Sequence, residues 1–197
     1  VVPIRHNEPL GRVVPSLTPE RLKKFKFTNL ADPDIYYDEN IRRMVDNYRN
    51  IYAQTAEKMS QSGRADEARI MLDTLMQHVP FETIPGDERS FLLMARAYQS
   101  TGVKERVVEI MQKAEPVVLH RVTHARSQSE EEYIADFVNM IRFTYLDARD
   151  YDAAAAFNNR LAELLGDPYR QTPEELRREF EGIDSTETSS EDPPQGG

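Results

Sequence analysis

Two groups of side chains in this chain are of types that can do chemistry. His120 and His124 stand four residues apart, which places both imidazole rings on one face of a helix, as two of the three protein ligands of a catalytic zinc. A third ligand would have to come from the acidic residues at 130–132, and only the composition of that stretch suggests them. We favour the other interpretation, in which the two histidines are partly exposed residues of a connecting segment. We expect no bound metal, no cofactor and no catalytic residue.

The second group is a segment in which carboxylates accompany tyrosines. Its members are Asp32, Asp34, Tyr36, Tyr37, Asp38 and Glu39. Carboxylates beside aromatic rings can bind a cation or a sugar, so this segment is the candidate glycan or cation site. The alternative is a buried aromatic entry to a helix, with Asp38 as its N-cap and Ile35 or Tyr36 packed beneath it.

Composition excludes several classes of function. The chain has no cysteine, so it forms no disulfide and no thiolate metal site. Its net charge is −9 without a basic stripe, which argues against nucleic acid as a partner. Apolar runs such as 91–95 are far shorter than the roughly 20 residues that cross a bilayer, so we expect no membrane insertion. The chain begins Val-Val-Pro, and we expect a piece of a longer or processed protein.

The hydrophobic pattern predicts an all-α fold of antiparallel helical hairpins. Apolar residues recur at steps of three and four, and turns fall at Gly63, at Gly102 and near Arg149-Asp150. The predicted helices are 40–62 with 65–78, 88–100 with 103–115, and 133–148 with 152–165. They make hairpins at about 40–80, 88–115 and 131–165.

The stretch Gly63–Pro80, with Ala68, Leu72 and Leu75 between its ends, resembles a tetratricopeptide repeat. The resemblance implies that the hairpins stack as a short solenoid, which a helix at 172–180 would cap. The turns are spaced by 39 and 47 residues, against a tetratricopeptide period of about 34, and the extra residues fall between hairpins. One irregular bundle is the alternative.

The ends of the chain are expected to differ from this helical region at 32–180. Residues 1–31 read as an extended lead-in with a short helix at 19–25, whose Lys23, Lys24 and Lys26 form a small basic cluster. This cluster is either a solvated helix face or a contact to an anionic membrane surface or partner. Residues 181–197 are acidic and nearly free of apolar groups, so we expect a disordered tail.

The tetratricopeptide resemblance also implies a concave surface that faces a ligand. Aligned on the turns, its positions are Asn50, Glu57, Arg89, Arg96, Gln99, Asp136, Asn139 and Phe143. Mixed charges and amides suit an extended peptide or protein segment. An ordinary solvated face is the alternative.

The run Asp32–Met44, followed by Tyr48-Arg49-Asn50, resembles the C-terminal soluble region of a family of large bacterial multi-pass membrane proteins. Their membrane part is similar to protein O-mannosyltransferases, which are glycosyltransferases, and the family was long of unknown function. The resemblance covers about 25–118. It implies a domain on the extracytoplasmic, periplasmic side of a bacterial membrane; without the resemblance we would expect the cytoplasm.

From these features we expect a non-catalytic protein–protein interaction module that belongs to a membrane glycosyltransferase-like parent. No catalytic residue is carried over, because the chain lacks the membrane helices and the acidic catalytic loop of such enzymes. The partner would be a protein or peptide segment, or its own membrane domain. The alternative left open is an accessory domain that binds the glycan or the acceptor and contributes directly to glycosyl transfer.

Overall fold

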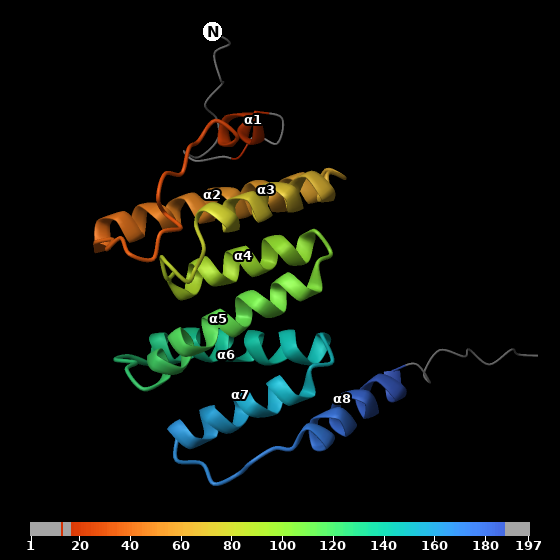
Figure 1. Ribbon diagram of the computed structural model, residues 1–197. Helices are drawn as coiled ribbons and strands as arrows, with labels where there is room; N and C mark the ends of the chain where they lie inside the picture. The colour runs from red at the N-terminus through yellow and green to blue at the C-terminus, as the bar shows by residue number, and fades with distance from the viewer. Residues whose placement is uncertain (1–12, 14–16, 188–197) are drawn as a thin grey trace, which may run out of the picture. The chain divides into compact units, whose positions relative to one another are not determined.

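The computed structural model describes residue 13 and residues 17–187, and within them the chain is all-α, as predicted (Figure 1). The described helices are α1 (Thr18–Leu22), α2 (Glu39–Gln61), α3 (Ala65–His78), α4 (Glu88–Ser100), α5 (Lys104–Val122), α6 (Gln128–Asp147), α7 (Tyr151–Leu164) and α8 (Pro173–Glu187). No described helix is both long and apolar enough to cross a bilayer.

The chain divides into two compact units, Val1–Ile110 and Met111–Gly197, and the division falls within α5. The prediction of one continuous solenoid therefore stays a prediction. The lead-in before residue 17 lies outside the described residues except for Val13, which is buried.

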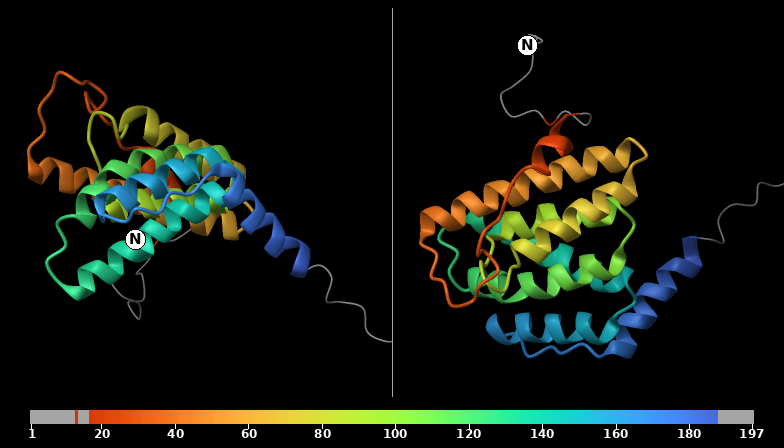
Figure 2. Two further views of the ribbon diagram at one scale, coloured as in Figure 1. Left: turned by 90° about the horizontal axis from the view of Figure 1, so that it is seen from below. Right: turned by 45° about the horizontal axis from the view of Figure 1, so that its top comes forward.

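In the first unit, α2 packs against both α3 and α4. Figure 2 shows α2 and α3 lying side by side and antiparallel. Small side chains permit this close approach, because Ala53 and Ala56 on α2 and Ala68 on α3 have no exposed surface. Leu72 and Leu75 fill the remaining space, so the alternation of small and large apolar residues in the sequence is what brings the helices into contact.

The predicted turns are confirmed at all three positions. Gly63, Gly102 and Arg149 adopt positive φ values of 78°, 81° and 59°. In each case the next residue donates its backbone N–H to a carbonyl five residues back, as Arg64 does to Met59, which is the Schellman pattern. The same geometry closes α7 at Gly166, whose φ is 70°.

The second unit places α7 against both α6 and α8. Thr172 and Glu175 form a capping box at the start of α8, in which each side chain accepts a hydrogen bond from the other's backbone N–H. Leu176 is 1% exposed, so one apolar side chain anchors the helix. α8 runs to Glu187 rather than ending at residue 180, because no proline interrupts this glutamate-rich segment. The tail beyond residue 187 lies outside the described residues.

Two further helices end at other residues than the sequence predicted. α5 continues through Pro116 to Val122, since Ala114 and Val118 extend its buried stripe by another turn and offset the single lost N–H bond. His120 therefore lies on a helix rather than on a connector. α1 ends at Leu22 rather than at residue 25, and Phe25, beyond its end, is 46% exposed.

Candidate functional site

The predicted concave-surface residues are divided between the two units. Asn50 and Glu57 lie half-buried on α2, Arg89, Arg96 and Gln99 are exposed on α4, and Asp136, Asn139 and Phe143 are exposed on α6. The first five residues belong to the first unit and the last three to the second. The side-chain oxygen of Asn50 is buried, and it has no hydrogen-bond partner within the described residues.

One of these residues, Asn139, lines an open groove in the second unit. The groove has a volume of about 370 Å³. Its lining residues are Val122, Ala125, Glu131, Ile134, Ala135, Val138, Asn139, Leu161 and Leu165. We call it the α6 groove. The small side chains Ala125 and Ala135 leave the space open, and the turn at Gly166 sets Leu165, 63% exposed, at its edge.

The α6 groove is mainly apolar, and its polar groups differ in kind. Among the lining residues, Glu131 carries the one formal charge and Asn139 the one amide. Asp136 and Phe143 stand three residues before and four after Asn139, so helix geometry sets them beside it on α6. An amide can pair with a peptide backbone, and apolar walls can hold side chains, so the groove suits a protein segment. A smaller groove of about 300 Å³ in the first unit contains none of the predicted concave-surface residues, although Lys23 of the basic cluster lines it.

The acidic–aromatic segment uses most of its polar groups to build the entry to α2. Asp38 caps α2, as predicted, by accepting a hydrogen bond from the backbone N–H of Ile41 at 2.9 Å. Asp32 accepts one from the N–H of Asp34 at 3.0 Å, and Glu39 pairs with Arg43 on the next turn.

The buried side chain at this entry to α2 is Tyr37, whereas Ile35 and Tyr36 are exposed. Its hydroxyl donates to the carbonyl of Asn29 at 2.5 Å, and Tyr36 is 83% exposed. Sequence periodicity could not separate two adjacent tyrosines, because a loop has no fixed side-chain alternation.

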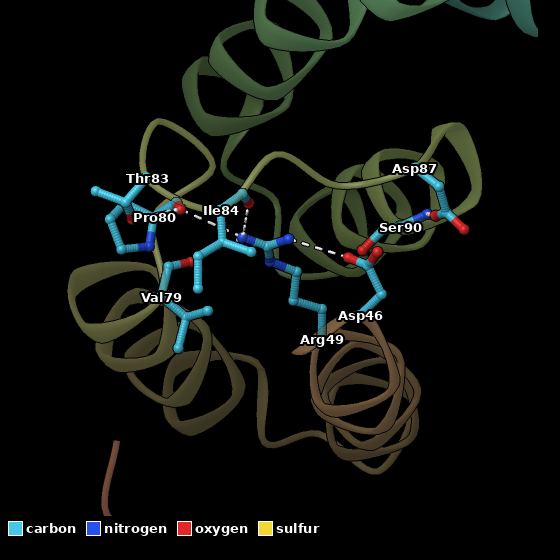
Figure 3. A network of polar contacts seen from close by, with 8 residues as sticks. All are labelled: Asp46, Arg49, Val79, Pro80, Thr83, Ile84, Asp87 and Ser90. Atoms are coloured by element: carbon cyan, nitrogen blue, oxygen red, sulfur yellow. Dashed lines mark hydrogen bonds and ion pairs between the residues drawn. The ribbon is translucent and has the colours of Figure 1, made fainter. Parts of the chain in front are cut away.

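Sequence reasoning missed a buried cation, which holds the loop between α3 and α4 (Figure 3). Arg49 has no exposed surface. Its guanidinium donates to the carbonyls of Val79, Pro80 and Ile84 and to the carboxylate of Asp46, and it lies 4.1 Å from the centre of the Phe81 ring. Burial lowers the pKa of Arg49, and Asp46 opposes that shift. The network positions backbone rather than a ligand, so we assign it to the fold.

Two buried tyrosines repeat one contact in the two units. Tyr98 on α4 donates to Asp73 on α3 at 2.9 Å, and Tyr145 on α6 donates to Glu115 on α5. Each carboxylate also meets an arginine, Arg106 at 3.7 Å from Asp73 and Arg160 beside Glu115. Burial, followed by the hydrogen bond to the carboxylate, raises the pKa of both tyrosine hydroxyls.

The histidine pair does not assemble into a larger cluster. The rings of His120 and His124 stack with centroids 4.1 Å apart, and both side chains are exposed. Within residue 13 and residues 17–187, no group of three histidine, aspartate or glutamate side chains gathers closely enough to hold a metal ion.

Comparison with known proteins returned no relative: no family model, no curated protein and no solved structure matches the chain.

Proposed function

We propose that this chain is a non-catalytic interaction module, and that its second unit binds a segment of another protein in the α6 groove. The observation that supports this is an open apolar groove with a single amide and a single carboxylate among its lining residues. Apolar side chains of the partner would enter between α6 and α7. Asn139 would pair with its backbone, and a lysine or arginine would face Glu131.

Selection from a library of short random peptides displayed on phage tests this proposal on the full chain. Enriched peptides are expected to combine apolar residues with lysine or arginine. Leu165→Gln and Glu131→Lys should each weaken their binding by about tenfold or more, since one loses apolar contact and the other reverses the charge.

The neighbours of these two residues provide matched controls. Leu164 and Glu132 are also exposed, and neither lines the groove. Leu164→Gln and Glu132→Lys should leave binding unchanged. If the control variants weaken binding as much as the groove variants, or if no peptide is enriched, the groove is not the binding site.

The proposal extends to the parent protein, on the strength of the resemblance at Asp32–Met44. The chain would be the extracytoplasmic C-terminal domain of a membrane-bound glycosyltransferase-like protein. Since the chain has no cysteine, Lys104→Cys introduces a single thiol at an exposed position. In a full-length protein with its other cysteines replaced, a membrane-impermeant maleimide should label this thiol in intact spheroplasts. Labelling only after lysis would place the domain in the cytoplasm instead.

Exposure of Tyr36 favours a second candidate, a glycan-binding accessory role. An aromatic ring that is 83% exposed next to Asp34 is a possible platform for a sugar. NMR titration with mannose and with mannose oligosaccharides should then shift loop signals, and Tyr36→Ala should abolish the shifts. Tyr169→Ala, at a tyrosine that is 56% exposed, is the control. Absence of any shift at millimolar sugar removes this candidate.

A further inference from the structure

One stripe along α2 carries no acidic side chain, although the chain as a whole has a net charge of −9. The outer stripe of α2 follows steps of three and four residues: Asn40, Met44, Asn47, Ile51, Gln54 and Lys58. The acids of α2, namely Glu39, Asp46 and Glu57, are spaced by seven and eleven residues, so helix geometry gathers them on a different stripe.

Apolar side chains project from this acid-free stripe. Met44 is 52% exposed and Ile51 is 42% exposed. Tyr48 lies between them on the same side of α2, and the ring of Phe25 meets it edge-on with centroids 5.3 Å apart. Phe25 is itself 46% exposed, so three large apolar side chains stand in solvent around one half-buried tyrosine.

Lysines precede and follow Phe25 in the sequence. Lys24 and Lys26 are both exposed, and no ion pair joins either to another described residue. The nearby Glu20 is already neutralised by Lys23 at 2.7 Å. Residues 24–26 come directly after α1, which packs beside α2 (Figure 1). We call Lys24, Phe25, Lys26, Met44 and Ile51 the basic–apolar patch.

We propose that the basic–apolar patch docks on the surface of an anionic lipid bilayer without crossing it. Lysines that accompany exposed phenylalanine, methionine and isoleucine are the combination that binds such a surface, because the ammonium groups meet anionic headgroups and the apolar side chains enter the headgroup boundary. The patch residues are absent from the linings of both grooves described above, which favours a bilayer over an inserted peptide. The proposal does not depend on the α6 groove.

The chain has no tryptophan, so one introduced tryptophan reports on its own surroundings alone. Phe25→Trp introduces a single fluorophore into the patch. Vesicles of equal parts phosphatidylglycerol and phosphatidylcholine, at low ionic strength, should shift its emission to the blue, and brominated acyl chains should quench it. Phe143→Trp, at a ring that is 57% exposed on α6, is the matched control and should show neither effect.

Charge reversal separates lipid docking from adventitious contact. Lys24→Glu with Lys26→Glu should reduce co-sedimentation with these vesicles at least roughly tenfold. Arg96→Glu with Lys104→Glu changes the net charge equally at exposed positions elsewhere and should reduce it far less. Binding should also disappear in phosphatidylcholine alone and at high salt.

Three results would overturn the proposal: no co-sedimentation at low salt, equal loss in the two double variants, or an equal shift at Phe143→Trp. A blue shift of Phe25→Trp on addition of soluble polyglutamate, without any vesicle effect, would indicate an acidic protein partner instead. Thermal unfolding of each variant controls for loss of structure.

Discussion

Nη2 of Arg49 donates a hydrogen bond at 2.6 Å to the carbonyl oxygen of Ile84, thirty-five residues further along the chain. The same nitrogen serves Val79 and Pro80, so one side chain of α2 satisfies three carbonyls of the loop that leads into α4. A loop of this length carries backbone acceptors that the helices on either side cannot pair, and the buried guanidinium supplies the donors.

Replacement of Arg49 should therefore lower the free energy of unfolding far more than replacement of an exposed arginine. Arg49→Met leaves the Asp46 carboxylate and the carbonyls of Val79 and Ile84 without the guanidinium donor, and we expect a loss of about 3 kcal/mol in the free energy of unfolding. Arg43→Met, which removes an exposed pair with Glu39, should cost less than about 0.5 kcal/mol. Urea denaturation measures both changes, and hydrogen exchange should rise at 79–87 in the first variant. Equal costs would show that the network is not structural.

Stability should fall in alkaline solution because of the buried tyrosines. The pKa of Tyr98 is raised in the folded chain above its ordinary value of about 10. Its contribution is complete below about pH 10 and is lost as pH rises from there, because only the unfolded chain then ionises this hydroxyl.

Tyr98→Phe should weaken that alkaline loss, at a cost of about 1 kcal/mol near pH 7 for the missing hydrogen bond. Asp73 keeps Arg106 at 3.7 Å, which limits the cost. Melting temperatures at neutral pH and above pH 10 test this, with exposed Tyr169→Phe as control. A pH dependence identical to that of the unmodified chain would contradict it.

Two glycines should respond to the same substitution with opposite signs. Gly102 has φ of 81° and no atom within 4 Å of an added Cβ, so Gly102→Ala should destabilise by about 1 kcal/mol through backbone strain alone. Gly182 lies within α8 and also has open space around it, so Gly182→Ala should stabilise that helix by up to about 1 kcal/mol. Circular dichroism during thermal unfolding measures both, and a destabilising Gly182→Ala would count against the α8 boundary.

The α4 part of the predicted concave surface can be tested separately from the groove. Arg89 and Arg96 are seven residues apart and exposed on one face of α4. If α4 contributes to partner binding, Arg89→Glu with Arg96→Glu should weaken binding of selected peptides at least about tenfold. The double change Lys24→Glu with Lys104→Glu introduces the same charge at exposed positions outside α4 and serves as the control. Unchanged affinity would restrict binding to the second unit.

The sequence predicted those features of the fold that depend on neighbouring residues. Helix periodicity, the Asp38 cap and the turns at Gly63 and Gly102 are set within a few residues, and the structure confirms them. Arg149 shows the limit of that reasoning, because its neighbours predict a turn but no residue preference predicts φ of 59° at an arginine.

Features set by distant contacts were not predictable in this way. Arg49 looks like any charged residue on a helix until the loop at 79–84 lies over it. The continuation of α5 beyond Pro116 depends on burial of Val118. Only Asn139 of the α6 groove was identified, because its lining residues come from separate parts of the chain and no local pattern predicts which of them meet.

Three long-distance hydrogen bonds described above each join residues of the same unit. Tyr98 reaches Asp73 over 25 residues, Tyr145 reaches Glu115 over 30, and Arg49 reaches Ile84 over 35. Folding tends to be faster where contacting residues lie close in sequence. Each of these three contacts can therefore form without any residue of the other unit.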